Sequence, residues 1–370
     1  MTMTTEYLGQ RIAEARTRAS LTQSQLAQGV GLDRSVLAKI ESGARRVSAL
    51  ELNRIAQTVG VRIESLLREQ VPAVVSHRNL ADPGAASPMI DAEVSQRVEA
   101  VELLTRLDTS FTLPSMPVHA MPTAPEEAEA LAGEARTALG VPAGGPLKGL
   151  GERVSCVGLM PFVVDLGSES ADAATVLLAS GAVTVINGHL APGRRRLALA
   201  HEVGHALVAD DYTVDWKVQE AASDRREALF DFFARALLMP GKQLRKDWTT
   251  GLRDHETRPL AVRLASEYRV DFSTLSRRLM ELDLIDGGMV STIRSYITTR
   301  LDIQTMGLVV PVELEIGDVP PTYARSVERL YLGEKISAAR ALDLFFGAID
   351  EADLPALPSR TDDEIWQFVS

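Results

Sequence analysis

The sequence predicts a mainly α-helical protein with a small β-sheet, an α+β fold. Apolar residues recur at helical spacing in residues 7–67, 124–139, 218–240 and 259–285. Two shorter apolar runs, 154–164 and 174–186, are broken by Gly and are typical of strands. A hydrophobic fraction of 45% in 370 residues is enough for proper cores and predicts two or three domains.

The first predicted domain, residues 1–68, is all-α and contains a helix-turn-helix. Thr22 is a suitable N-cap for a helix that continues through Ala27, and residues 29–32 form a tight turn. A second helix starts near Asp33 and is closed by Gly43. The helical spacing turns Val36, Leu37 and Ile40 inward and leaves Arg34, Ser35 and Lys39 facing outward.

The motifs T-Q-x-x-L-A and I-E-x-G, in this order, resemble the Xre/lambda-repressor-type helix-turn-helix over residues 6–68. The resemblance implies that the second helix enters the major groove of double-stranded DNA with its N-terminal residues leading. Arg34 and Ser35 are then the base-reading candidates. The candidates for phosphate contacts are Gln23, Lys39, Arg45 and Arg46.

Charge favours this interpretation over a merely solvated loop at Arg45 and Arg46. Residues 1–68 hold ten Lys/Arg and six Asp/Glu, a net charge of +4, whereas the whole chain has a net charge of −11. A basic module on an acidic protein suits localised DNA binding, and the acidic remainder limits non-specific association with DNA. Symmetric operators would require a homodimer.

Residues 69–123 are predicted to be a linker that carries a connecting helix. Val71-Pro72 and Asp82-Pro83-Gly84 mark a linker or loosely packed arm. Residues 91–107 have a helical period and suit a connecting or dimerising helix. Three prolines interrupt residues 111–123.

A second domain is predicted over residues 124–290. It opens with an amphipathic helix, 124–139, and continues with the two strand-like runs. Cys156 is the only cysteine, which excludes a disulfide framework and a cysteine zinc site, and we expect a buried structural thiol.

The most informative motif of the chain follows, His201-Glu202-Val203-Gly204-His205, inside an apolar run. In a helix, His201 and His205 lie one turn apart on the same face and can bind one metal ion, normally zinc. Glu202 points beside the metal, where it can take a proton from a metal-bound water and pass it to a leaving amine. The alternative is an ordinary helix with two hydrogen-bonded histidines.

A hydrolytic zinc site needs a third protein ligand. Residues 218–240 are predicted to form one long helix that ends at Pro240-Gly241. Its acidic residues share one stripe, which is usually a solvated face: Glu220, Asp224, Glu227 and Asp231. Because the rest of this helix is apolar and it closely follows the histidines, Glu227 is the predicted third ligand and Glu220 the fallback. Asp231 could accept the free N–H of a ligand histidine.

Residues 194–205 resemble the R-x-R-F-T-L-A-H-E-L-G-H segment of ImmA/IrrE-type metallopeptidases, and residues 227–240 resemble the family's E-x-E-A-N-x-F-A-x-x-L-L-M-P. Residues 185–187 resemble the short strand before the active helix. Leu229, Asp231 and Leu197 replace the family's Glu, Asn and Phe, and none of these departures removes a residue that hydrolysis needs. The resemblance implies a zincin-like fold and a substrate that is itself a helix-turn-helix repressor, cleaved in a stress or mobile-element response.

The remaining segments carry less chemistry. Residues 259–285 show a helix, a turn and a helix with Arg277 and Arg278 exposed, which suits either completion of the second domain or a further winged-helix-like DNA contact. His189, His255 and Tyr212 are weak candidates for stabilising an oxyanion. Residues 291–370 are predicted to be a helical regulatory or oligomerisation region, with a helix that begins at Ser337.

The sequence therefore predicts a cytoplasmic DNA-binding regulator with a zinc-metallopeptidase-like domain and no membrane segment. One alternative is a transcription factor whose peptidase-like domain is a non-catalytic sensor or scaffold. A further alternative is an antitoxin-like autoregulator whose C-terminal half binds a partner protein. The ligand set would also accept manganese or iron.

Overall fold

The computed structural model describes residues 5–19, 21–59, 63, 66, 74–78, 88–168, 170–208, 220–308 and 312–357. The chain divides into two compact units, Met1–Val71 and Pro72–Ser370. Helices predominate in both, and the second also holds one small sheet, which confirms the predicted fold class. None of the helices within the described ranges combines the length and the apolarity that a membrane span requires.

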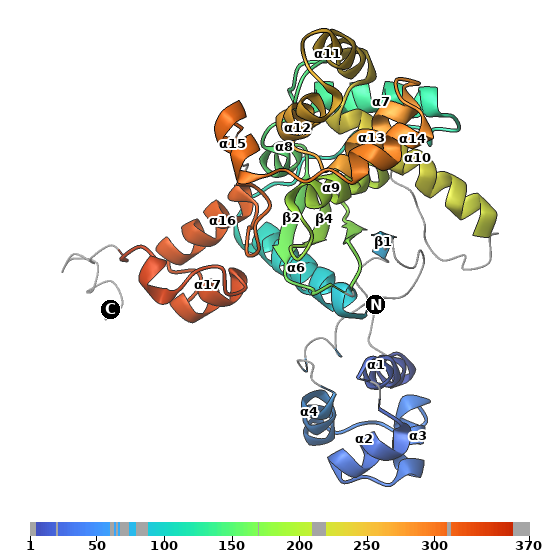
Figure 1. The fold of residues 1–370 in the computed structure, drawn as a ribbon. Helices are drawn as coiled ribbons and strands as arrows, with labels where there is room; N and C mark the ends of the chain where they lie inside the picture. The colour runs from blue at the N-terminus through green and yellow to red at the C-terminus, as the bar shows by residue number, and fades with distance from the viewer. Residues whose placement is uncertain are drawn as a thin grey trace, which may run out of the picture. The chain divides into compact units, whose positions relative to one another are not determined.

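In the described part of the first unit, four helices pack around a core of their own: α1 (Thr5–Arg18), α2 (Gln23–Val30), α3 (Arg34–Glu41) and α4 (Ala49–Thr58) (Figure 1). Thr22 caps α2 in a capping box with Gln25, as its side chain predicts. Gly43 follows α3 with φ +76°, and a Cβ there would lie 2.5 Å from the Cα of Glu6, so only glycine fits. The core includes Ile12, Leu26, Leu37, Ile40 and Ile55.

The second unit is built on a four-stranded sheet in the order β1-β3-β4-β2. Its strands are β1 (Val74–Arg78), β2 (Leu159–Val164), β3 (Ala173–Leu177) and β4 (Ala182–Asn187). The β3–β4 and β1–β3 pairs are antiparallel, whereas β2 and β4 are parallel. The strand predicted at 185–187 is confirmed as the end of β4.

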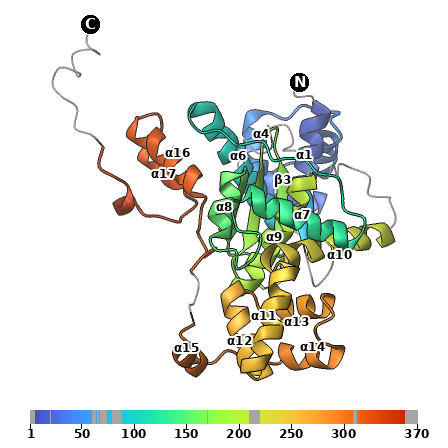
Figure 2. The same cartoon turned by 90° about the horizontal axis from the view of Figure 1, so that it is seen from above.

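Two helices pack on the sheet, on either side of the strands (Figures 1 and 2). They are α6 (Pro88–Leu107) and α9 (Pro192–Val208). The segment predicted to be a linker therefore contributes a helix whose buried side chains, including Val94, Val98 and Val101, lie against β3 and β4. The division into 69–123, 124–290 and 291–370 stays a prediction.

Helix α9 also contacts α8 (Leu150–Cys156) and α10 (Glu220–Leu238). The same unit also contains α7 (Pro125–Ala138), α11 (Gly241–Asp254), α12 (Thr257–Tyr268), α13 (Phe272–Glu281), α14 (Gly287–Arg294) and α15 (Arg300–Met306). Arg136 of α7 is buried and donates to the carbonyl of Leu237 in α10 at 2.7 Å. This bond and the extensive α7–α10 contact hold α10 in place beside α9.

Three expectations for this unit are wrong. Residues 154–156 belong to helix α8, and the strand begins only at Leu159. Cys156 is exposed at the end of that helix, so it is not a buried thiol. Arg278 is fully buried rather than exposed, because its guanidinium donates to the carbonyl of Met239 and to the carboxylate of Glu129.

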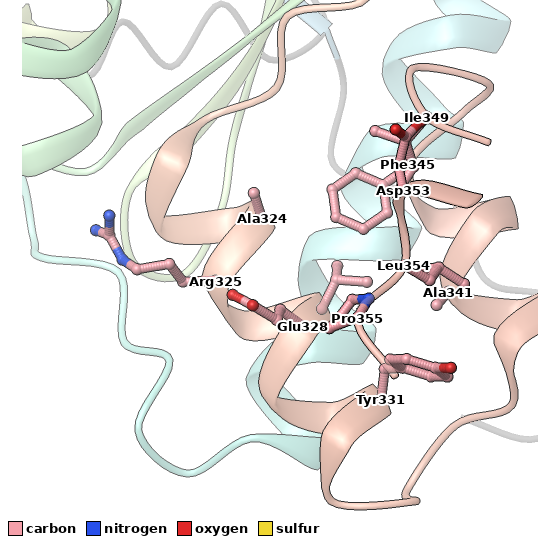
Figure 3. A pocket seen from close by; sticks show the side chains of 11 residues that line it. Ala324, Arg325, Glu328, Tyr331, Ala341, Phe345, Ile349, Asp353, Leu354 and Pro355 are labelled. Atoms are coloured by element: carbon pink, nitrogen blue, oxygen red, sulfur yellow. The ribbon is translucent and has the colours of Figure 1, made fainter. Parts of the chain in front are cut away.

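The chain ends, within the described part, in α16 (Pro321–Leu332), α17 (Ala338–Leu344) and the short 3-10 helix η1 (Glu351–Asp353). Ser337 caps α17, as predicted. These elements enclose a cavity of about 240 Å³ that is lined mainly by apolar side chains, among them Tyr331, Phe345 and Leu354 (Figure 3). Asp108, after α6, accepts hydrogen bonds from Ser326 and Arg329 and ties α16 to the sheet layer.

Candidate functional site

The candidate metal centre lies between α9 and α10. Gly204 of α9 faces two rings of α10, and a Cβ at this position would lie 2.9 Å from Phe230 and 3.0 Å from Phe233. The missing side chain therefore lets the two helices approach closely. The ring of His205 lies over Phe230, with the ring centroids 4.0 Å apart. This close packing brings the acidic stripe of α10 toward the histidines of α9.

Three side chains point at one another there. The Nε2 atoms of His201 and His205 are 3.1 Å apart. Glu227 places Oε2 3.1 Å from Nε2 of His201 and Oε1 3.6 Å from Nε2 of His205. Within the described part of the chain, these three residues form the one group of His, Cys, Asp and Glu side chains close enough to hold a metal ion. The structure thus brings together all three residues that the sequence proposes as ligands.

Asp231 fixes the protonation of His201. Its Oδ1 lies 2.9 Å from Nδ1 of His201. A carboxylate accepts, so in the neutral imidazole Nδ1 carries the proton and Nε2 presents a lone pair. The Nε2 of His201 and the carboxylate of Glu227 then face each other as two acceptors. Such a contact is stabilised by a cation that both groups bind, so the donor set fits a metal ion.

The spacing of the ligand atoms also fits one ion. Two nitrogen ligands at about 2.0–2.1 Å from a tetrahedral zinc are about 3.3 Å apart. The three separations of 3.1, 3.1 and 3.6 Å lie around this value. Both histidines are buried, whereas Glu227 is partly exposed.

Glu227 has the ionisation state that a ligand needs. Burial raises its pKa, but the hydrogen bonds that protonated His201 and His205 donate, together with their positive charges, outweigh that effect. The pKa of Glu227 therefore lies well below its usual range, and the side chain stays a carboxylate at neutral pH. A cation bound to the neutral imidazoles would take the place of the histidine charges.

Glu202 lies on the sheet side of α9 and is fully buried. Its Oε2 accepts a hydrogen bond of 2.6 Å from the hydroxyl of Thr175 in β3. Because Thr175 gives its proton to the carboxylate, Thr184 of β4, 2.7 Å away, donates to Thr175. Sequence reasoning missed these threonines. The available signal was a hydroxyl in the middle of each otherwise apolar strand.

The other candidates do not join this cluster. His189 lies 3.7 Å from Asp165, and His255 contacts Arg263 at 2.8 Å. Tyr212 lies outside the described residues, as does the side chain of Glu220, the fallback ligand.

The candidate DNA interface is the outer surface of α3 and its flanks. Leu37 and Ile40 are buried, whereas Arg34, Ser35 and Lys39 are exposed at the predicted positions. Arg34 lies at the first position of α3 and Lys39 in its last turn, so both ends of the exposed surface carry a positive charge.

Two of the predicted phosphate contacts have partners inside the unit. Gln23 donates to the carboxylate of Glu41 at 2.7 Å, and Arg16 binds the same carboxylate. Arg45 binds Glu51 at 2.9 Å. Arg46 is exposed. These bonds hold Gln23 and Arg45 in place at the start of α2 and before α4.

The comparisons with known proteins identify two families. Residues 12–66 match the model for helix-turn-helix domains, and residues 164–280 match the model for IrrE N-terminal-like domains. Both resemblances found in the sequence are thereby confirmed. No curated protein is significantly similar to the chain.

Two solved structures are also similar in part. The restriction-modification controller protein C.AhdI from Aeromonas hydrophila shares 36% identity over 16% of this chain and 92% of its own, with a TM-score of 0.16. PlcR of Bacillus thuringiensis, solved in complex with the peptide PapR7 and DNA, shares 13% identity over 93% of each chain, with a TM-score of 0.18. TM-scores this low carry no argument about the fold.

Proposed function

We propose that this DNA-binding regulator, which joins a helix-turn-helix domain to an IrrE N-terminal-like domain, is also a zinc-dependent endopeptidase. The observation that carries the proposal is the convergence of His201, His205 and Glu227 on one point, with Glu202 on the adjoining turn of α9. Two histidines, one carboxylate and an adjacent glutamate are the set that metal-assisted peptide hydrolysis requires.

The ligands favour zinc. Imidazole nitrogen and carboxylate oxygen are both ordinary zinc ligands, and three protein ligands leave one position open for water. Bound zinc lowers the pKa of that water and polarises a carbonyl. Asp231 holds the ring of His201 in the orientation and tautomer that binding needs.

Glu202 is the proposed general base and acid. It would take a proton from the attacking water and give it to the leaving amine. Thr175 positions the Glu202 carboxylate through its 2.6 Å hydrogen bond, and Thr184 orients that hydroxyl in turn. Thr175 is a positioning residue, because it acts through Glu202.

The proposed substrate is a helix-turn-helix repressor protein, following the resemblance to ImmA/IrrE-type peptidases. On the DNA side, Arg34 and Ser35 would read base edges, while Lys39, Arg46, Gln23 and Arg45 would contact phosphates. A homodimer would match a symmetric operator.

The burial of Glu202 favours a second candidate function. A group that exchanges protons with water and substrate must reach both, yet Glu202 is fully buried. A non-catalytic domain that binds zinc and serves as a sensor or scaffold for the transcription factor would need no such access.

Cleavage of candidate repressors by the full-length, zinc-loaded protein separates the two functions. The wild type should cleave a repressor, and Glu202→Gln should lose at least about 100-fold of that rate, the lower end of a general base's contribution. Glu202→Gln must retain zinc as the matched control. If the wild type and Glu202→Gln both bind zinc and form equal amounts of product, or if neither forms any product, the result would support the sensor function.

A further inference from the structure

The outer edge of β3 is occupied by a strand from the same chain. β1, residues 74–78, pairs antiparallel with β3 and forms the end of the sheet next to it (Figure 1). In sequence, β1 follows the boundary between the two units at Val71 and lies almost 100 residues before its partner.

The register places β1 beside the proposed catalytic base. Ser76 is paired with Thr175, whose hydroxyl binds the Glu202 carboxylate. Neighbouring strands are about 4.8 Å apart, so the backbone of Ser76 runs one strand spacing from the residue that positions Glu202. β1 also contacts α9, the helix that carries Glu202 and the two histidines.

The same edge is where an extended peptide would bind. Peptides commonly bind by adding a strand to a free sheet edge, with main-chain hydrogen bonds providing the affinity. The opposite edge, at β2, is paired to residues 317 and 318, since Val163 exchanges backbone hydrogen bonds of 3.1 and 3.0 Å with Asp318 and Gly317. Without β1, the strand β3 would form the other edge of the sheet, and β3 is the strand that binds Glu202 through Thr175.

We propose that residues 74–78 occupy the peptide-binding edge of β3 as an internal competitor, so that a substrate strand pairs beside Glu202 only after β1 has left. The proposal deepens the proposed peptidase function and rests on it for the meaning of the site. The proposal explains why Glu202 is buried although it is the proposed catalytic base. β1 contacts both β3, which binds Glu202, and α9, which carries it.

The first test compares two full-length double variants in a Glu202→Gln background. Adjacent residues of an antiparallel strand alternate between paired and outward amides, so Ser76→Pro/His77→Pro removes at least one paired N–H. Ser76→Ala/His77→Ala keeps both amides and is the matched control. Fluorescence anisotropy measures the binding of a labelled peptide that copies residues 72–80.

We expect the proline variant to bind the peptide about tenfold more tightly than the alanine variant. This factor assumes that β1 is paired with β3 in about 90% of the alanine-variant molecules, which leaves about 10% able to bind the peptide. A copy of the peptide with proline at the same two positions should not bind. Equal affinity of the two variants for the peptide would overturn the proposal.

A disulfide-locked variant provides a second test that does not depend on correct folding of the proline variant. His77 is paired with Ala174, and cross-strand partners have Cα separations within disulfide range. In a Cys156→Ala background, the oxidised His77→Cys/Ala174→Cys protein should not bind the peptide, and reduction should restore binding. Binding that is the same in both redox states would refute the proposal.

Measuring peptide binding and hydrolysis separately distinguishes failure of the internal-competitor proposal from failure of the peptidase proposal. Tighter peptide binding by the proline variant without any hydrolysis, in the Glu202 parent, would support the edge site and contradict the peptidase function. Repressor cleavage at the same rate with β1 locked and released would support the peptidase and overturn the internal competitor.

Discussion

Gly204 is the point at which helix packing and metal geometry depend on each other. A Cβ there would lie 2.9 and 3.0 Å from ring carbons of Phe230 and Phe233, whereas carbon atoms pack best at about 3.5–4.0 Å. Gly204→Ala therefore requires the rings of α10 to move by about 0.5 Å or more, and overpacking of this kind costs about 1–3 kcal/mol.

The helix propensity of alanine opposes this loss by about 1 kcal/mol, so a matched glycine is needed. Gly133 lies on the exposed face of α7, and a Cβ there would meet nothing within 4 Å. Gly133→Ala should thus stabilise the second unit by up to about 1 kcal/mol. The difference between the two variants isolates the packing strain, which we expect to be about 1–3 kcal/mol.

Urea unfolding followed by tryptophan fluorescence measures this difference, because all three tryptophans of the chain lie beyond residue 71. Zinc affinity of Gly204→Ala should also fall, since a shift of about 0.5 Å exceeds the tolerance of about 0.2 Å for a metal–ligand distance. The reasoning is refuted if Gly204→Ala and Gly133→Ala change the free energy of unfolding equally and both retain wild-type zinc affinity.

Three further results are expected. Asp231→Asn should weaken zinc binding about 10–100-fold in a chelator competition, and wild-type affinity would exclude a role for this carboxylate. Arg34→Ala should weaken binding to the operator by about 1–3 kcal/mol and leave binding to random DNA unchanged. Lys39→Ala should weaken binding to operator and random DNA alike, and should lower the slope of log affinity against log salt concentration by about 1 in an anisotropy titration. The reverse pattern would exchange the roles of the two residues. Burial raises the pKa of Asp108, but hydrogen bonds from Ser110, Ser326 and Arg329 lower it below its usual value of about 4. The ionised carboxylate therefore stabilises the folded state above that pH, and this contribution is lost as the pH falls. The free energy of unfolding should therefore decrease more steeply below about pH 4 in the wild type than in Asp108→Asn, and equal slopes would contradict this assignment.

The residues of the metal cluster could be proposed from the sequence because local geometry determines much of their placement. The i, i+4 spacing of His201 and His205 puts both imidazoles on one face of any helix. Glu227 and Asp231 share one stripe of the next helix for the same reason. The approach of the two helices depends on Gly204, whose role appears only when the rings of Phe230 and Phe233 are in place.

Long-range contacts explain what sequence reasoning missed. Arg278 is buried because its partners, Met239 and Glu129, come from segments 39 and 149 residues away. The pairing of β1 with β3 similarly joins two segments that are far apart in the sequence. The hydrogen bond from Thr175 to Glu202 became recognisable only when β3 was placed next to α9.

Elemental analysis of metal content tests the central claim most directly. We predict about one zinc per chain in the purified wild type, as expected for a single three-ligand site, and loss of that zinc in both His201→Ala and Glu227→Ala. Glu126→Ala, which removes an exposed carboxylate outside the cluster, should retain it. A wild type that holds no metal after preparation without chelator, or a Glu227→Ala variant that keeps its zinc, would contradict the account.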